Sequence, residues 1–247
     1  MVRLNTSLRW MVGLASLLTN LNGCQPSAPP VSVVPAVPKE PKGPAGRTPV
    51  EDMYGVNDPA AIQFRDDAAS NATPDPQLVD LAFVDLAGKK VSLGDYVGKK
   101  NLVLVITRGS ARYVCVYCST QTSRLVAQYP EFTKRDAEVL VVFPLKAAGD
   151  HELADDFLKF VKQKLPSSTA EIPFPLVLDV ELKGVDQLGL RHNLSRPATY
   201  ILDKQGQVRF AYVGETEADR PSVKSMLAQL DEIQGDTPTR PATTELK

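Results

Sequence analysis

The sequence predicts an α/β fold with a central mixed sheet of about five strands flanked by helices. Two runs of apolar residues, "NLVLVIT" at 101–107 and "AEVLVVFPL" at 137–145, lack the alternation of half-exposed strands and predict strands buried on both faces. The segment that follows each run has helical character. A strand-helix-strand-helix order indicates parallel strands with helices on both faces of the sheet.

The first half of the predicted domain contains a strand pair and two helices. "LAFVDLAGKKVSL" at 81–93 predicts two strands joined by a turn at Gly88. Residues 116–129 are rich in helix formers and predict a helix directly after the first buried strand. "DHELADDFLKFVKQKL" at 150–165 carries apolar residues at helical spacing, which predicts an amphipathic helix.

The second half has a different pattern. "ATYILD" at 198–203 and "QVRFAYVG" at 207–214 flank "KQG", which predicts a β-hairpin. "DRPSVKSMLAQLDEI" at 219–233 predicts a final helix. A parallel βαβ half followed by a β-hairpin and a last helix is the plan of a thioredoxin-like fold.

The N-terminal part of the chain predicts export. Residues 1–24 combine two arginines with a short apolar run and read as a secretory signal, because the run is too short to span a membrane. "LNGC" at its end resembles a bacterial lipobox, so we expect lipidation of Cys24. The lipid would anchor the protein to a membrane of the bacterial cell envelope, facing the periplasm or the exterior.

The expected domain lies between two flanking segments. Residues 25–74 begin with a proline-rich stretch that predicts a flexible tether, in which "PAAIQFRDDAA" at 59–69 could form a short helix. Residues 75–235 are expected to form one thioredoxin-like domain, and residues 236–247 a disordered tail. The net charge of −1 shows no basic stripe, so we expect no nucleic-acid partner.

Cys115-Val-Tyr-Cys118 is the motif that carries the predicted chemistry. It lies at the end of a predicted buried strand and at the opening of a predicted helix, where unpaired backbone N–H groups stabilise a thiolate. The two-residue spacing lets the sulfurs close into a disulfide, which favours redox exchange. A structural zinc site would need four ligands, and a purely structural disulfide would close only a small loop. We therefore expect Cys115 and Cys118 to be catalytic, with no metal and no cofactor.

Three segments resemble the alkyl hydroperoxide reductase and thiol-specific antioxidant group, the peroxiredoxin-like members of the thioredoxin superfamily. The resemblance covers roughly residues 78–235, and its most specific parts are "FVDLAGKKVSLGDYVGKKNLVLVITRG", "CVYCSTQTSRL" and "SRPATYILDKQGQVRFAYVG". It implies a thioredoxin-like fold and a thiol-dependent oxidoreductase. Its substrate would be a peroxide or a disulfide-bearing exported protein, and an unidentified thiol would serve as the reductant.

The resemblance also implies roles for single residues. In thioredoxin-type enzymes the first cysteine of the motif, here Cys115, attacks, whereas the pattern of peroxiredoxins places the attacking cysteine at Cys118. Both possibilities stay open. Arg196 matches an arginine often seen in the family, and Pro197 matches a cis-proline that faces the redox pair. We expect Arg196, Pro197 and Thr199 to bind substrate.

A binding protein is the alternative to an enzyme. Copper-handling assembly factors of the Sco type share this fold, a membrane tether and a cysteine pair with a distant histidine. His192 lies 74 residues beyond Cys118 in the chain, and thiolates are soft ligands that suit Cu(I). The sequence alone therefore leaves copper binding as a second hypothesis.

Overall fold

The computed structural model describes residues 62–73, 75–110, 114–167 and 170–236, all of which belong to one compact unit. The predicted signal peptide, the lipidation site at Cys24 and residues 25–61 of the predicted tether lie outside the described residues. Residues 237–247 of the predicted tail also lie outside them. The expectations for those segments stay predictions.

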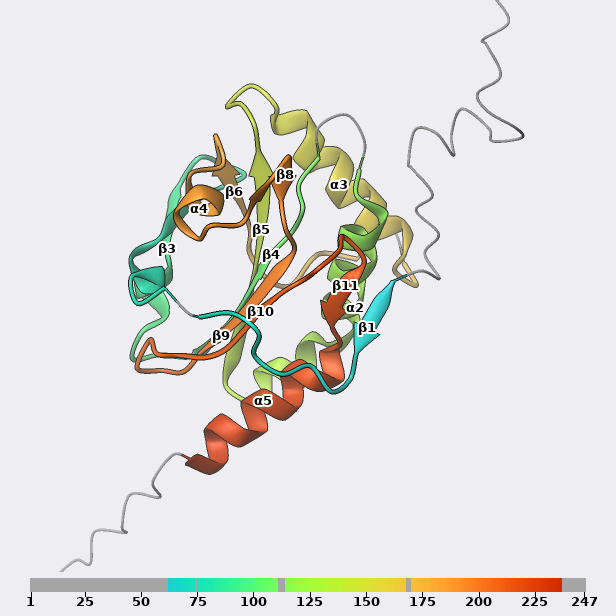
Figure 1. Ribbon diagram of the computed structural model, residues 1–247. Coiled ribbons are helices and arrows are strands. Elements are labelled where there is room, and N and C mark those ends of the chain that lie inside the picture. The colour runs from blue at the N-terminus through green and yellow to red at the C-terminus, as the bar shows by residue number, and fades with distance from the viewer. Residues whose placement is uncertain (1–61, 74, 111–113, 168–169, 237–247) are drawn as a thin grey trace, which may run out of the picture. The chain divides into compact units, whose positions relative to one another are not determined.

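A seven-stranded mixed sheet forms the centre of the fold (Figure 1). Its strand order is β10-β9-β4-β5-β6-β2-β3, in which β4, β5 and β6 are parallel and the other pairs are antiparallel. The sheet therefore contains the expected mixed core, widened by the strand pair at its edge. The bounds are β2 Ala82–Asp85, β3 Lys90–Ser92, β4 Asn101–Ile106, β5 Ala137–Leu145, β6 Leu176–Val180, β9 Ala198–Leu202 and β10 Val208–Val213.

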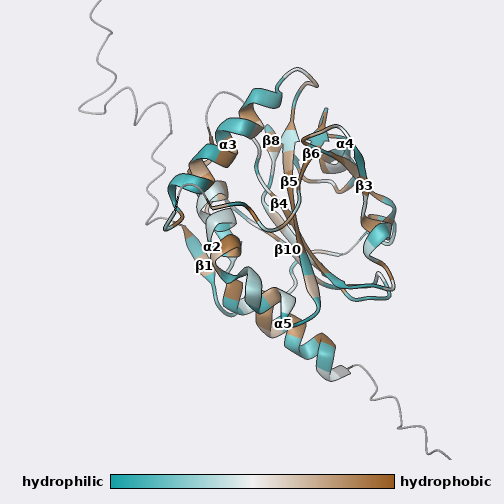
Figure 2. Ribbon diagram, turned by 180° about the vertical axis from the view of Figure 1, so that it is seen from behind, coloured by the Kyte–Doolittle hydropathy of each residue, from teal (hydrophilic) through white to brown (hydrophobic). Residues whose placement is uncertain are grey.

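Helices cover both faces of the sheet, as the sequence predicts. One face packs against α2 (Val116–Thr133), α3 (His151–Gln163) and α5 (Val223–Asp236), whose buried side chains form one core cluster with the strands. The other face packs against the short helix α4 (Lys183–Gln187) and the 3-10 turns η2 (Leu78–Asp80) and η3 (Leu93–Tyr96). Figure 2 shows hydrophobic colours along β5, whereas hydrophilic and hydrophobic colours alternate along α3. None of the described helices is long and apolar enough to cross a membrane.

Alternation along β4 and β5 explains why two cores form. Successive side chains of a strand point to opposite faces, so Val103 and Val105 join the cluster under α2 while Leu104 joins the cluster under α4. Every residue of β4 is buried, which confirms the interpretation of its apolar run. The face under α2 is the one that contains both cysteines.

Two small sheets lie outside the central one. One is the hairpin of β7 (Arg191–His192) and β8 (Leu194–Ser195), and the other pairs β1 (Gln63–Arg65) in parallel with β11 (Asp219–Pro221). The prediction of a helix over 59–69 is therefore wrong for residues 63–65, which form a strand. Residues 63–65 find backbone partners in β11, and such tertiary pairing overrides a weak local preference.

The folded domain also extends further toward the N-terminus than the boundary expected at residue 75. Asn71 lies within the predicted tether, but its side chain donates to the carbonyl of Val213 at 3.0 Å and accepts from the backbone N–H of Val213 at 2.8 Å. Its own backbone N–H donates to the carbonyl of Ala211 at 3.0 Å. Residues 62–73 are thus bound to the domain.

Two glycines with positive φ provide a test of the loop that leads to α2. Gly109 has φ +80°, and a Cβ there would lie 2.5 Å from the carbonyl oxygen of Pro144. Gly88 has φ +81° with nothing within 4 Å. We expect Gly109→Ala to lower the free energy of unfolding by about 2–5 kcal/mol through strain and overlap, and Gly88→Ala by about 1–2 kcal/mol through strain alone. Urea unfolding measures both, and equal losses would contradict the close approach at Gly109.

Candidate active site

Cys115 and Cys118 lie where the connection from β4 enters α2. Cys115 is the N-cap residue of the helix, and its sulfur accepts from the backbone N–H of Cys118 at 3.2 Å. The two cysteines form a disulfide with a Cα–Cα distance of 5.2 Å. The expected position of the pair at a helix N-terminus is confirmed, so the partial positive charge of that terminus acts on both sulfurs.

The two sulfurs differ in burial and in hydrogen bonding. Cys118 has an exposed fraction of 0% and Cys115 of 5%. The sulfur of Cys118 accepts from the backbone N–H of Arg108 at 3.4 Å and from Nη2 of Arg220 at 3.4 Å. The same Nη2 lies 4.0 Å from the sulfur of Cys115. Cys118 is therefore the sulfur that the surrounding donors stabilise more strongly.

Arg220 is a buried cation, with an exposed fraction of 1%. Its Nη1 donates to Oε1 of Gln121 at 2.6 Å, and its Nη2 donates to the carbonyl oxygen of Glu217 at 2.9 Å. Within the described part of the chain, Nε has no hydrogen-bond partner and no carboxylate forms an ion pair with the guanidinium. Burial lowers the pKa of Arg220 to about 9, although the charges of Glu217 and Asp219 oppose this effect.

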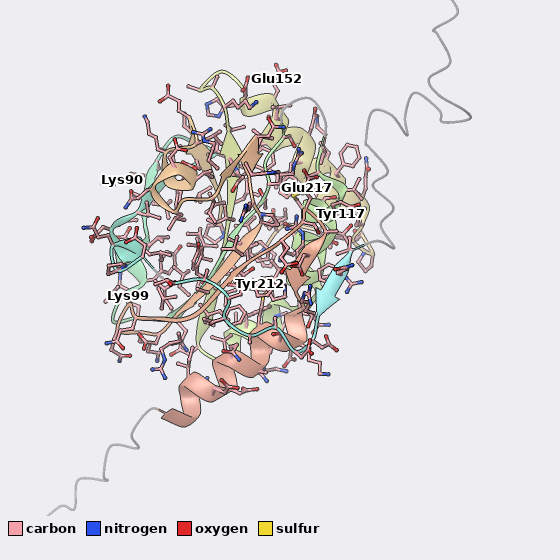
Figure 3. All side chains as sticks on the ribbon, viewed as in Figure 1. Lys90, Lys99, Tyr117, Glu152, Tyr212 and Glu217 are labelled. Atoms are coloured by element: carbon pink, nitrogen blue, oxygen red, sulfur yellow. A yellow bond between two sulfur atoms is a disulfide. The ribbon has the colours of Figure 1, made fainter. Side chains whose placement is uncertain are left out.

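Two chain segments meet beside Cys118. Arg108 follows β4, and its Nε forms an ion pair with Oε1 of Glu217 at 2.5 Å. Glu217 lies between β10 and β11, so the ion pair joins the segment that donates a backbone N–H to Cys118 with the segment that carries Arg220. Figure 3 shows Glu217 and Tyr117 on the same side of the molecule, close to α2. The ion pair is partly exposed and marks the solvent side of the site.

The three residues predicted to bind substrate have different positions. Arg196 is exposed, and the side-chain donors that reach the two sulfurs within the described residues come from Arg220. Pro197 is buried, and its carbonyl accepts from the backbone N–H of Gly214 at 2.8 Å. Thr199 is buried in β9, opposite Val105 in β4. The arginine that the fold brings to the cysteines is Arg220, and the roles expected for Arg196, Pro197 and Thr199 stay predictions, as does the cis peptide bond before Pro197.

Sequence reasoning missed Arg220 and its partner Gln121. One signal was available in α2, because residues three and four positions after Cys118 lie on the same helix face as its sulfur. These are Gln121 and Thr122, both of which are buried. Polar residues on the core face of a helix indicate a buried polar site. No comparable signal distinguished Arg220 from other arginines.

The described residues contain no cluster of ligands that would support the copper-binding hypothesis. His192 lies in β7 and is exposed. No group of three or more His, Cys, Asp and Glu side chains in the described ranges could hold a metal ion. The cysteine pair is surrounded instead by hydrogen-bond donors, which suit a thiolate and compete with metal coordination.

Three known proteins resemble this chain in sequence or in fold. A curated 1-Cys peroxiredoxin from Onchocerca volvulus is 28% identical over 101 residues, which cover 40% of this chain and 43% of that protein. The chain thus matches less than half the length of this relative. A mutant of peroxiredoxin 6 from Arenicola marina is 15% identical with a TM-score of 0.50, over 68% of this chain and 73% of that chain. A secreted disulfide oxidoreductase from Mycobacterium tuberculosis is 12% identical with a TM-score of 0.47, over 64% of this chain and 99% of that chain.

The match to a family model is more extensive. Residues 70–211 match the model of the AhpC/TSA family, and this range is more than half of the 247 residues. It includes the cysteine pair, the whole parallel part of the sheet and the first strand of the hairpin. The family match and the likeness to the peroxiredoxin 6 structure confirm the thioredoxin-like architecture expected from the sequence. The chain is a member of the AhpC/TSA family, the peroxiredoxin-like thiol oxidoreductases of the thioredoxin superfamily.

Proposed function

We propose that this protein is an extracytoplasmic, lipid-anchored thiol peroxidase that cycles Cys115 and Cys118 between dithiol and disulfide. The observation that carries the proposal is the environment of Cys118, whose sulfur accepts from both the guanidinium of Arg220 and the backbone N–H of Arg108. Membership of the AhpC/TSA family supports the same chemistry.

A thiolate at Cys118 would be well stabilised in the reduced protein. An opposite charge within about 4–6 Å lowers the pKa of a thiol, and a helix N-terminus acts in the same direction. Arg220 has no ion-pair partner among the described carboxylates, so a thiolate would supply the counter-charge that its buried guanidinium lacks. These electrostatics favour Cys118 over Cys115 as the attacking sulfur.

The reaction balances with the groups of the site and one external reductant. The Cys118 thiolate attacks the terminal oxygen of a hydroperoxide, so that an S–O bond forms, the O–O bond breaks and the leaving alkoxide takes a proton to become an alcohol. The thiol of Cys115 then attacks the sulfenic acid, which forms the disulfide and releases water. A thiol reductant restores the two cysteines through a mixed disulfide. Because Cys118 has no exposed surface in the disulfide form, the reduced site must open before a peroxide can reach its sulfur.

Thiol-disulfide exchange is the second candidate, and a specific observation favours it. Cys115 is the slightly more exposed of the two residues and caps the helix, as an attacking cysteine of the thioredoxin type would. In that reaction the Cys115 thiolate attacks a disulfide of an exported protein, and Cys118 resolves the mixed disulfide. Arg220 would then stabilise Cys118 as a leaving group.

Hydrogen peroxide and an oxidised protein substrate, added separately to the reduced protein, distinguish the two reactions. We expect peroxide to convert the dithiol to the disulfide rapidly, and the Cys115→Ser variant to accumulate a sulfenic acid on Cys118. The Cys118→Ser variant is the matched control and should not form it. Mass spectrometry with a sulfenic-acid trapping reagent measures each product. Inertness to peroxide together with fast exchange through Cys115 would reject the peroxidase in favour of the second candidate.

The role of the guanidinium has its own test. In a Cys115→Ser background, we expect Arg220→Gln to raise the pKa of the Cys118 thiol by about 1–2 pH units, because the nearest positive charge is lost. Arg220→Lys keeps the charge and should raise the pKa less. The thiolate absorbance as a function of pH measures the pKa, and the unfolding midpoint of each variant controls for loss of structure. An unchanged pKa in Arg220→Gln would contradict the proposed stabilisation of the thiolate.

The proposed lipid anchor predicts that lipid labelling and membrane association depend on Cys24. We expect Cys24 to incorporate radiolabelled palmitate in a bacterial host and the protein to fractionate with membranes. Cys24→Ala should abolish both properties without changing peroxide oxidation of the cysteine pair. Labelling that persists in Cys24→Ala would place the modification elsewhere.

A further inference from the structure

We infer that Arg65, in the strand that follows the predicted tether, is a positioning residue for the redox pair: through Asp219 it holds β11 where Arg220 reaches Cys118. The inference rests on the proposed function for the meaning of that contact. It adds a residue outside the site, in a segment that the sequence assigned to a tether.

β11 depends on β1 for its strand pairing. The two strands form a sheet of their own, separate from the central sheet, with Phe64 opposite Arg220 in the register. The backbone N–H of Gln63 donates to the carbonyl of Ala218 at 2.9 Å, and that of Ser222 donates to the carbonyl of Arg65 at 2.9 Å. These bonds bracket β11 at both ends. In the described part of the chain, β1 is the strand that pairs with β11.

Asp219 connects this pairing to the rest of the domain. Its Oδ1 accepts from Nε of Arg65 at 2.6 Å and from the hydroxyl of Tyr212 at 2.8 Å, and its Oδ2 accepts from the backbone N–H of Glu215 at 3.1 Å. The residue is 2% exposed. Burial alone would raise the pKa of this carboxyl, but the hydrogen bonds from Arg65 and Tyr212 outweigh it and lower the pKa. Asp219 is therefore a buried carboxylate whose charge Arg65 balances.

The position of Asp219 determines the position of its neighbour. Successive side chains of a strand point to opposite faces, so Asp219 is held by Arg65 and Tyr212 while Arg220 extends toward α2 and its cysteines. A guanidinium hydrogen bond to sulfur weakens quickly with distance and angle. A small displacement of β11 would therefore separate Nη2 of Arg220 from Cys118.

The backbone at Gly214 also packs closely against β11. A Cβ at Gly214 would lie 2.4 Å from the carbonyl oxygen of Asp219 and 2.9 Å from Cγ of Pro197. The chain therefore approaches β11 as closely as a glycine allows. The ion pair from Arg65 helps to hold Asp219, and with it β11, against this glycine.

The chain offers a matched control for Arg65. Lys224, in α5, forms an ion pair with Asp66 at 3.3 Å, and both side chains are exposed. This pair ties the same N-terminal segment to the domain but does not contact Asp219 or Arg220. Loss of Lys224 removes one positive charge and one contact with the N-terminal segment, but it leaves the ion pair of Arg65 and Asp219 intact.

The experiment compares Arg65→Gln, Arg65→Lys and Lys224→Gln in the full-length Cys115→Ser protein. We expect Arg65→Gln to raise the pKa of the Cys118 thiol and to slow sulfenic-acid formation by about twofold to thirtyfold, the range for a residue that acts through another. Arg65→Lys should restore part of both properties, and Lys224→Gln should change neither. Unfolding midpoints identify a variant that loses structure. If Arg65→Gln loses structure, Tyr212→Phe is measured in its place, because it removes the other hydrogen bond to Oδ1 of Asp219.

The pKa does not depend on the identity of the substrate, so the two proposals can fail separately. An unchanged pKa in Arg65→Gln, or an equal change in Lys224→Gln, overturns the inference even when peroxide oxidises the protein rapidly. Inertness of the protein with both cysteines to peroxide rejects the peroxidase, while the pKa comparison still decides the role of Arg65.

Discussion

The contact between the buried guanidinium of Arg220 and the sulfur of Cys118 is the interaction on which the site depends. A buried cation is costly unless hydrogen bonds and an opposite charge compensate for its lost hydration. Gln121 and the carbonyl of Glu217 supply hydrogen bonds, but no described carboxylate forms an ion pair with the guanidinium. The site is therefore most favourable electrostatically when one cysteine is a thiolate. This requirement links the fold to redox chemistry.

Several other elements of the fold position the guanidinium of Arg220 relative to the sulfur of Cys118. Cys115 caps the N-terminus of α2 and Arg220 lies in β11, so the helix N-terminus and the guanidinium approach the pair from different elements. β11 carries the guanidinium, and its own partner is β1, from a segment more than 150 residues earlier in the chain. The ion pair of Arg108 and Glu217 joins the two loops beside the site. Each of these contacts constrains where the positive charge lies relative to sulfur.

Local patterns were sufficient for most elements. The nearly continuous apolar runs identified β4 and β5 because a strand buried on both faces is mostly apolar, and both strands are almost entirely buried. The turn residues "KQG" identified the hairpin of β9 and β10, which is observed. Residues 63–65 were assigned incorrectly because an exposed three-residue strand has almost no period of its own. Its structure comes from β11, which no local pattern could reveal.

The sequence by itself determined the fold class and the position of the cysteine pair at a helix N-terminus, since apolar periodicity and the spacing of Cys115 and Cys118 are local properties. Only the tertiary structure decided which arginine serves the pair. Arg220 lies 102 residues from Cys118 in the chain, whereas the expected Arg196 is exposed in a connection between strands. Arginines look alike in a sequence, because the path of the intervening loops decides which one is brought to the sulfurs. That path depends on β1, Asp219 and the close approach at Gly214.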